Sequence, residues 1–117
     1  MRVDELLDET GLPFAACAFN NPPNETYAVY SEEIVRRGAD LKNCITEYGA
    51  TIEVYAYDFY DDEAVQRVVR ALDRHNINFR KYETTFINSE YLYCTRFEYG
   101  TDLKDSQADR LRSEFDF

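Results

Sequence analysis

The sequence predicts an α+β fold: a mostly antiparallel or mixed β-sheet of about four to five strands packed by two helices, with a C-terminal arm or short helix. Three observations indicate this class. A helical pattern occupies the middle of the chain, a long alternating run precedes it, and two aromatic-rich alternating runs follow it. With 117 residues, 44% of them hydrophobic, the chain has the length of one domain with one core. We expect residues 1–100 to form this domain and residues 101–117 to extend from it.

The first element is expected to be a short helix in the segment "VDELLDETGLP". Val3, Leu6 and Leu7 recur at helical spacing, and Gly11 suits the left-handed position that follows many helices. Pro13 lacks an N–H group and has a fixed φ. The helix should therefore end before it.

The next segments are predicted to be strands and loops in turn. Residues 14–19, "FAACAF", are a short apolar run typical of a buried strand, and residues 20–25, "NNPPNE", have the composition of a loop. Residues 26–31 are the next predicted strand. In residues 32–44 a glycine and mixed charges interrupt the periodicity, which leaves either a crossing segment or a long β-arm. A long strand is expected over residues 45–58, with alternate side chains on opposite faces: Ile52, Val54 and Ala56 against Glu53, Tyr55 and Tyr57.

The clearest element is a helix over residues 61–76. Apolar residues keep the i, i+3, i+4, i+7 rhythm of one helix face, at Val65, Val68, Val69 and Leu72. Asn76 can adopt the left-handed conformation after the last turn. This face is expected to lie against the sheet.

A hairpin is predicted next, with strands over residues 79–87 and 91–99 joined by "NSE". Asn88 is the residue expected to take positive φ in the turn. Each strand should place its odd-numbered residues on one face. The mostly polar residues 101–117 contain a narrow helical stripe of Ala108, Leu111 and Phe115, which has too little apolar surface to fold without something to lie against.

Three aspartates, Asp58, Asp61 and Asp62, stand between the long strand and the second helix, where carboxylates could form a metal or acid–base site. Asp61 occupies the expected N-cap position, and Asp62 belongs to the first turn, where negative charge complements the helix dipole. A magnesium site would need a phosphate-binding loop beside the carboxylates, and the four glycines of the chain form none. The pattern predicts that these aspartates start a helix.

The remaining reactive side chains also favour structural roles. Cys17, Cys44 and Cys94 are odd in number and lack C-x-x-C spacing, so they are expected to be small buried hydrophobes. His75 lies where the second helix should end, and its charged form would meet the negative pole of the helix dipole there. No GxSxG, HExxH, Walker or dinucleotide motif is found. We expect a protein that is not an enzyme, without catalytic, cofactor-binding or metal-ligating residues.

Charge and hydropathy limit the partners. Thirteen basic residues against 23 acidic ones give a formal net charge of −10, which argues against specific nucleic-acid binding. No run approaches the ~20 apolar residues that span a bilayer. The start "MRVDELLDETG" is acidic and has no apolar core, unlike a signal peptide, so synthesis and retention in a cytoplasm are expected.

Two stretches, "GLPFAACAFNNPPNETYAVYS" and "ADLKNCITEYGATIEVYAYDFYDDEAVQRVVRALDRHNINFRKYETTFINSEYLYCTRFEY", follow a familiar order of segments. A Gly-Leu-Pro start, a proline-rich loop, an Ile-Glu-Val-Tyr strand, an acidic helix start and a hairpin containing Tyr-Glu-Thr occur in succession. Over about residues 1–100 the chain resembles small tail-completion proteins (tail terminator or head–tail joining proteins) of long-tailed phages and prophages of Gram-positive bacteria. It departs from their pattern in "EEIVRRG" and in residues 101–117.

This resemblance implies a virion structural protein of the neck, assembled in the bacterial host cytoplasm. It implies a ring, expected to be hexameric, that caps the tail tube and joins it to the head. The partners would be further copies of the chain, the tail tube protein and head-completion or connector proteins, while DNA passes through an acidic lumen. Ring assembly needs apolar edges and exchanging arms, and the candidate interface residues are Pro22, Pro23, Tyr27, Arg36, Arg37, Leu111, Phe115 and Phe117.

Three other functions are compatible with the sequence. A head-completion or adaptor subunit bound to the portal would look similar in sequence pattern. An acidic inhibitor that mimics DNA fits the net charge, but its carboxylates should line one continuous face, whereas here Arg and Lys are interleaved with the acids on every element. A small enzyme that uses Tyr, Cys or Asp is the third alternative.

Overall fold

The computed structural model describes residues 2–37, 45–57 and 62–104 and confirms the predicted α+β class. The sheet has six strands, one more than the upper end of the prediction. The elements in chain order are α1 (Val3–Asp8), β1 (Phe14–Ala16), β2 (Tyr27–Arg37), β3 (Ile45–Ala56), α2 (Asp62–Arg74), β4 (Arg80–Lys81), β5 (Thr85–Ile87) and β6 (Leu92–Lys104).

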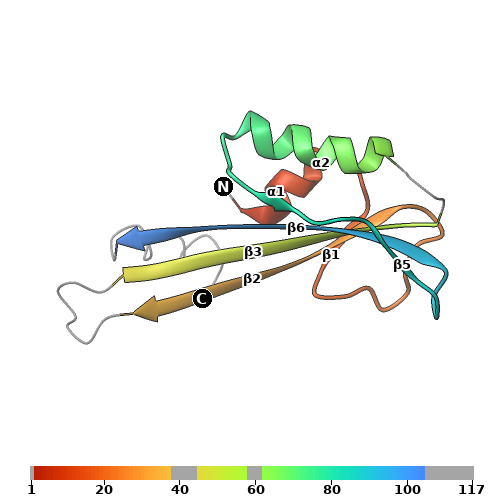
Figure 1. The fold of residues 1–117 in the computed structure, drawn as a ribbon, viewed down its shortest axis with the longest axis horizontal. Helices are drawn as coiled ribbons and strands as arrows, with labels where there is room; N and C mark the ends of the chain where they lie inside the picture. The colour runs from red at the N-terminus through yellow and green to blue at the C-terminus, as the bar shows by residue number, and fades with distance from the viewer. Residues whose placement is uncertain (1, 38–44, 58–61, 105–117) are drawn as a thin grey trace.

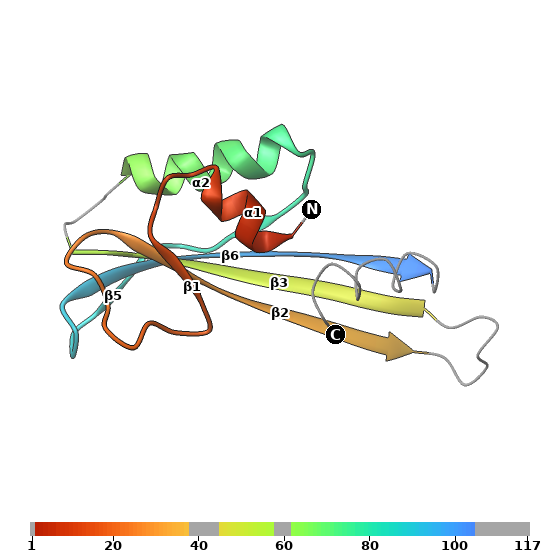
Figure 2. The ribbon, with the colours of Figure 1, turned by 180° about the vertical axis from the view of Figure 1, so that it is seen from behind.

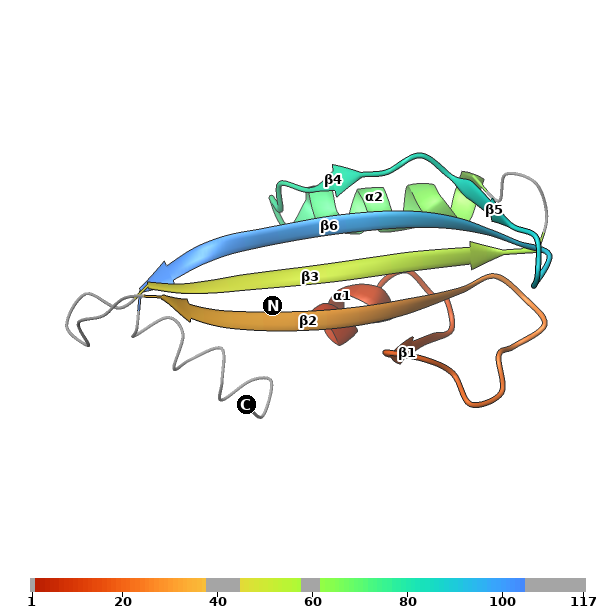
Figure 3. The same ribbon diagram turned by 60° about the horizontal axis from the view of Figure 1, so that its bottom comes forward.

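The sheet is built around three long antiparallel strands in the order β2-β3-β6. The short strand β1 runs parallel to β2 at one edge, and β4 and β5 pair with β6 at the other. Both helices lie over the same face, which we call the helix face; the other is the opposite face (Figures 1 and 2). Figure 3 shows the three long strands side by side.

The main core fills the space between the helices and the helix face. Ile52 and Val54 of β3 and Phe97 of β6 are fully buried, and Val68 and Leu72 of α2 pack against them. The alternation predicted for β3 is confirmed, since Glu53 and Tyr55 lie on the opposite face. The helical stripe predicted for α2 is confirmed as well, because side chains that recur every three to four residues share one side of a helix.

The three long strands continue beyond the helices as a projecting strand extension (Figure 1). We define it as residues 34–37, 45–48 and 101–104, which pair in continuous register. Of the two readings left open for residues 32–44, the long β-arm is confirmed as far as Arg37; residues 38–44 lie outside the described residues. β6 runs past residue 100 to Lys104. The molecule is 50 Å long and 28 × 23 Å across.

The hairpin prediction needs one correction. The strand predicted over residues 79–87 is two short strands, β4 and β5, separated by residues 82–84. In β5 Thr85 pairs with Cys94, whereas in β4 Lys81 pairs with Phe97, so three residues on this strand face two on β6. This is the geometry of a β-bulge. The bulge places the odd-numbered residues of β5 on the face opposite to those of β4. The single common face predicted for the odd-numbered residues of 79–87 is therefore wrong.

The turns show which local predictions were correct. Gly11 and Asn76 have φ of 73° and 56°, which confirms their left-handed positions after the two helices. In the β5–β6 turn the positive φ of 55° belongs to Tyr91, so the assignment to Asn88 is wrong. The strand expected over residues 14–19 ends at Ala16, because Cys17 takes a φ of 64° while its N–H donates to the Tyr30 carbonyl at 2.8 Å.

Candidate functional site

The carboxylate cluster between β3 and α2 is only partly described. Asp58 and Asp61 lie outside the described residues, and α2 begins at Asp62. Within residues 2–37, 45–57 and 62–104, no three or more His, Cys, Asp or Glu side chains are grouped so that they could hold a metal ion.

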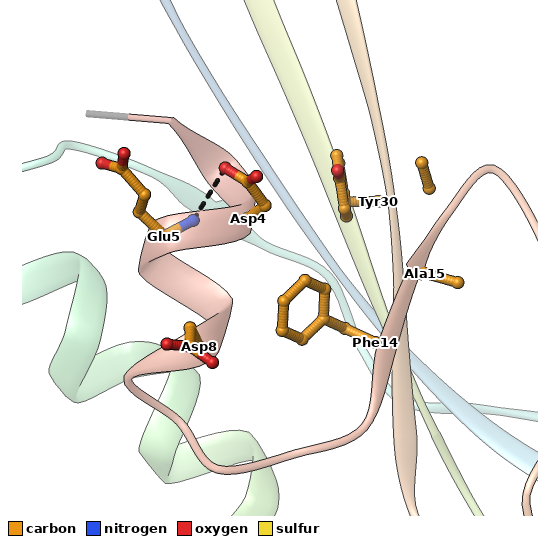
Figure 4. Close-up of a pocket in the computed structure, with 7 residues that line it drawn as sticks. Asp4, Glu5, Asp8, Phe14, Ala15 and Tyr30 are labelled. Atoms are coloured by element: carbon orange, nitrogen blue, oxygen red, sulfur yellow. Dashed lines mark hydrogen bonds between the residues drawn. The ribbon is translucent and has the colours of Figure 1, made fainter.

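A second acidic region lies in a groove of about 390 Å³ between α1 and β1. Figure 4 shows Asp4, Glu5 and Asp8 on α1, facing different directions, with Phe14 and Tyr30 across the groove. The Asp4 carboxylate already accepts two hydrogen bonds from Arg2, at 3.0 and 2.7 Å, and one from the Glu5 N–H at 2.9 Å. The Arg2 guanidinium lowers the pKa of Asp4, so this carboxylate stays ionised as the partner of Arg2 in an ion pair.

His75 joins the ends of the two helices. Its Nε2 lies 2.7 Å from an oxygen of Glu9, the residue that caps α1, and Arg74 contacts the other oxygen of Glu9 at 3.2 Å. The hydrogen bond with His75 lowers the pKa of the Glu9 carboxyl. The structural role predicted for His75 is therefore supported, with a carboxylate as its partner.

The cysteines divide between two environments. Cys94 is buried as predicted, and Cys17 is exposed, which contradicts the prediction for it; Cys44 lies outside the described residues. Burial raises the pKa of the Cys94 thiol to about 11, and the Glu53 carboxylate 3.7 Å away adds to the effect. A thiol with such a pKa stays protonated at neutral pH and is a poor nucleophile.

Two tyrosines and a glutamate form a polar cluster on the helix face, where the strand extension begins. The Tyr48 hydroxyl donates to the Glu32 carboxylate at 2.9 Å, and the Tyr48 and Tyr99 rings lie 6.3 Å apart. Burial raises the pKa of Tyr99 to about 12 and also raises that of Tyr48. Both hydroxyls therefore remain neutral at physiological pH and serve as hydrogen-bond groups.

Aromatic side chains gather on the opposite face near the start of β2. Phe19, Tyr27 and Tyr55 form a row in which Phe19 meets Tyr27 edge-on at 5.2 Å and Tyr27 stacks on Tyr55 at 5.3 Å. With Pro22 and Tyr57 they line an open hollow of about 480 Å³. The Tyr57 hydroxyl donates to the Pro23 carbonyl at 2.8 Å, which fixes the proline loop over the sheet.

Three large aromatic residues at this end of the sheet are exposed. None of them is among the candidate interface residues predicted from the sequence. Tyr91 is 76% exposed, Phe86 45% and Tyr57 42%. Together with the loop of residues 17–26 they form what we call the aromatic end. The signal that could have found them is the high aromatic content of the predicted strands over residues 45–58, 79–87 and 91–99, since tyrosine and phenylalanine are enriched at protein interfaces.

The candidate interface residues do not form one surface. Pro22, Pro23 and Tyr27 come together at the aromatic end, although Tyr27 is only 6% exposed and acts as a wall of the hollow. Arg36 and Arg37 stand at the other end of the sheet, in the strand extension. The other three candidates, which all belong to the C-terminal segment, lie outside the described residues: Leu111, Phe115 and Phe117.

No model of a known protein family matches the chain, and no curated protein matches it in sequence. No helix in the described part of the chain is long and apolar enough to cross a membrane.

Proposed function

We propose that this chain is a non-enzymatic structural subunit of the neck of a long-tailed phage or prophage virion. In this proposal, copies of the chain form a ring, expected to be hexameric, that caps the tail tube and joins it to the head. The observation that carries the proposal is the separation of two different features on one sheet. The aromatic end and the strand extension, with its open backbone edges, lie at opposite ends of a molecule 50 Å long.

A subunit that connects two partners needs two such surfaces. Exposed tyrosine and phenylalanine rings, as at Tyr91 and Phe86, bury large apolar areas on contact and can still form hydrogen bonds at the rim. The strand extension instead offers backbone edges. From Ser31 onward no described strand pairs with the outer edge of β2, and from Tyr99 onward none pairs with that of β6. Open strand edges are sites where another chain can add a strand.

The titratable groups of the sheet suit a building block better than a catalyst. The Cys94 thiol and the Tyr48 and Tyr99 hydroxyls are held protonated at neutral pH. The net charge of −10 per copy would line the lumen of a ring with negative potential, which repels DNA and lets it slide. The segment order shared with tail-completion proteins points to the same role.

Mass measurement with and without purified tail tubes tests this proposal. We expect the chain to bind tube ends as a ring, visible by electron microscopy, and the Tyr91→Ala and Phe86→Ala variants to bind less. Glu83→Gln, an exposed change between β4 and β5, is the matched control. Absence from tube ends would contradict the proposal. Binding to the portal of filled heads instead would favour the adaptor function.

A further inference from the structure

The outer edge of β2 is open over a defined length. β1 covers Ala28–Tyr30, and from Ser31 to Arg37 no described strand pairs with this edge. The Ala28 N–H donates to the Pro13 carbonyl and the Tyr30 carbonyl accepts from Cys17, so the even-numbered residues turn their backbone groups outward. This alternation continues along a regular strand. It gives residues 32, 34 and 36 outward N–H and C=O groups.

The sequence of this open length is self-complementary in charge when two copies run antiparallel. It reads "SEEIVRR", with two glutamates before an apolar pair and two arginines after it. Ile34 is the middle residue of Ser31–Arg37. If a second copy pairs antiparallel about Ile34, Glu32 stands opposite Arg36 in both halves, and Ser31 stands opposite Arg37. Glu33 is then diagonal to Arg37 on the other face. Opposite charges in these positions stabilise a strand pair.

We propose that β2 pairs with β2 of a second copy of this chain, about a two-fold axis through Ile34 and perpendicular to the sheet. Such an axis keeps the helices of both copies on the same side of the combined sheet. It also pairs even-numbered residues with even-numbered ones and odd-numbered with odd-numbered ones, as this register does. The pairing uses the whole length that β1 leaves open. It closes an edge that would otherwise be available to any other strand.

Glu32 supplies independent support. None of the ion pairs within the described residues includes it, and its carboxylate accepts a hydrogen bond from the neutral Tyr48 hydroxyl. Partial burial raises the pKa of this carboxyl group. Arg36 of the second copy would add a cation near this carboxylate, whose pKa is already lowered somewhat by the charge of Arg2. Acidic residues outnumber basic ones in this chain, 23 to 13. Two adjacent arginines on the open edge of β2 are therefore a distinctive feature of its sequence.

The dimer differs from the ring of the proposed function. Neighbours in a cyclic ring meet through two different surfaces, whereas a two-fold contact uses the same surface twice. The dimer is therefore a state of the free protein. A contact of one strand from each copy is small, and we expect it to dissociate on dilution.

Sedimentation equilibrium of the full chain tests the dimer. Two charge variants, Arg36→Glu/Arg37→Glu and Glu32→Arg/Glu33→Arg, place like charges opposite each other in both halves of the contact. We expect each to raise the dimer Kd by at least about tenfold. An equimolar mixture of the two variants should restore dimers, because the acidic strand of one then meets the basic strand of the other. Restoration also shows that both variants remain folded.

Four results would overturn the proposal. They are a monomeric wild type at every concentration, variants that dimerise like the wild type, a mixture that stays monomeric, and a chain of residues 1–104 that dimerises where the full chain does not. The last result would mean that residues 105–117 occupy the edge. A dimer that never joins tail tubes would leave this inference standing and remove only the proposed function.

Discussion

Glu32 is a residue whose carboxyl group the fold partly removes from water. Desolvation is the largest cause of its raised pKa, and nearby Asp4 adds to it, while the Tyr48 hydroxyl and Arg2 act in the other direction. A raised pKa means that the folded protein binds the proton more tightly than the unfolded chain. The stability that Glu32 contributes is therefore present below the unfolded pKa of about 4.5 and is lost as pH rises through the folded pKa.

The Glu32→Gln variant should remove this cost at neutral pH. Because the glutamine carbonyl can still accept from Tyr48, we expect the free energy of unfolding at pH 7 to rise by about 0.5 kcal/mol, a small value because the group is partly screened by solvent. The gain should shrink at acidic pH, where Glu32 is protonated. Urea titrations at pH 7 and pH 4, at low protein concentration, measure the difference, with exposed Glu83→Gln as the control. If the stability of Glu32→Gln relative to wild type were lower at pH 7 than at pH 4, the prediction would be contradicted.

Backbone conformation was predictable for some residues and not for others. Gly11 and Asn76 could be assigned because glycine and asparagine adopt positive φ readily wherever they occur. Cys17 and Tyr91 have no such preference and take positive φ where tertiary contacts end or turn a strand. Tyr91 is also largely exposed, and local strain at an exposed aromatic residue is consistent with its proposed contact role.

At the scale of elements, β3 and β6 approach closely where Gly49 pairs with Gly100. A Cβ atom on Gly100 would lie 2.6 Å from the carbonyl oxygen of Tyr48, whereas one on Gly49 would meet nothing within 4 Å. The obstructing atom belongs to the backbone, so a side-chain rotation cannot relieve the clash. Gly100 therefore sets how closely these strands can pack.

We expect Gly100→Ala to lower the free energy of unfolding by about 1–3 kcal/mol, as overpacking does, and Gly49→Ala to change it little. Urea denaturation of both variants tests this. Because the two glycines face each other in one register pair, they have the same strand propensity cost, and the difference between the variants isolates the clash. Equal destabilisation by the two substitutions would contradict this explanation.

The elements that the sequence predicted best are those whose pattern repeats. α2 has four apolar residues in one stripe, and β3 alternates without interruption, so periodicity alone located both and their buried faces. The bulge between β4 and β5 was not predictable, since one inserted residue changes the face without changing the composition. The length of β2 was also ambiguous, because residues 32–37, four of them charged, form a strand by pairing with β3 and not by local preference.

For the whole molecule, the sheet order decides which residues meet. Pro22 and Tyr27 are close in sequence and share the aromatic end, but Tyr57 and Tyr91 reach that end only because β3 and β6 are antiparallel neighbours. The candidate interface residues that the structure describes therefore lie at two opposite ends of the sheet. A list of candidate residues could not give this arrangement without the topology.

The role of residues 105–117 is tested by deleting them at the boundary that the structure indicates. β6 pairs with β3 up to Lys104 opposite Ile45, so a chain of residues 1–104 keeps every described strand pair. We expect it to unfold cooperatively with the stability of the full chain, yet to assemble poorly on tail tubes if the C-terminal segment is an assembly arm.

A chain of residues 1–100 is the matched comparison. It also removes Thr101–Lys104, the β6 part of the strand extension, and should be less stable by about 1–2 kcal/mol because those cross-strand pairs are lost. Urea denaturation and mass measurement on tail tubes separate the two effects. If the 1–104 chain assembles on tubes as well as the full chain does, residues 105–117 are not an assembly arm. The strand extension would then be the part of the molecule that reaches the neighbouring copy.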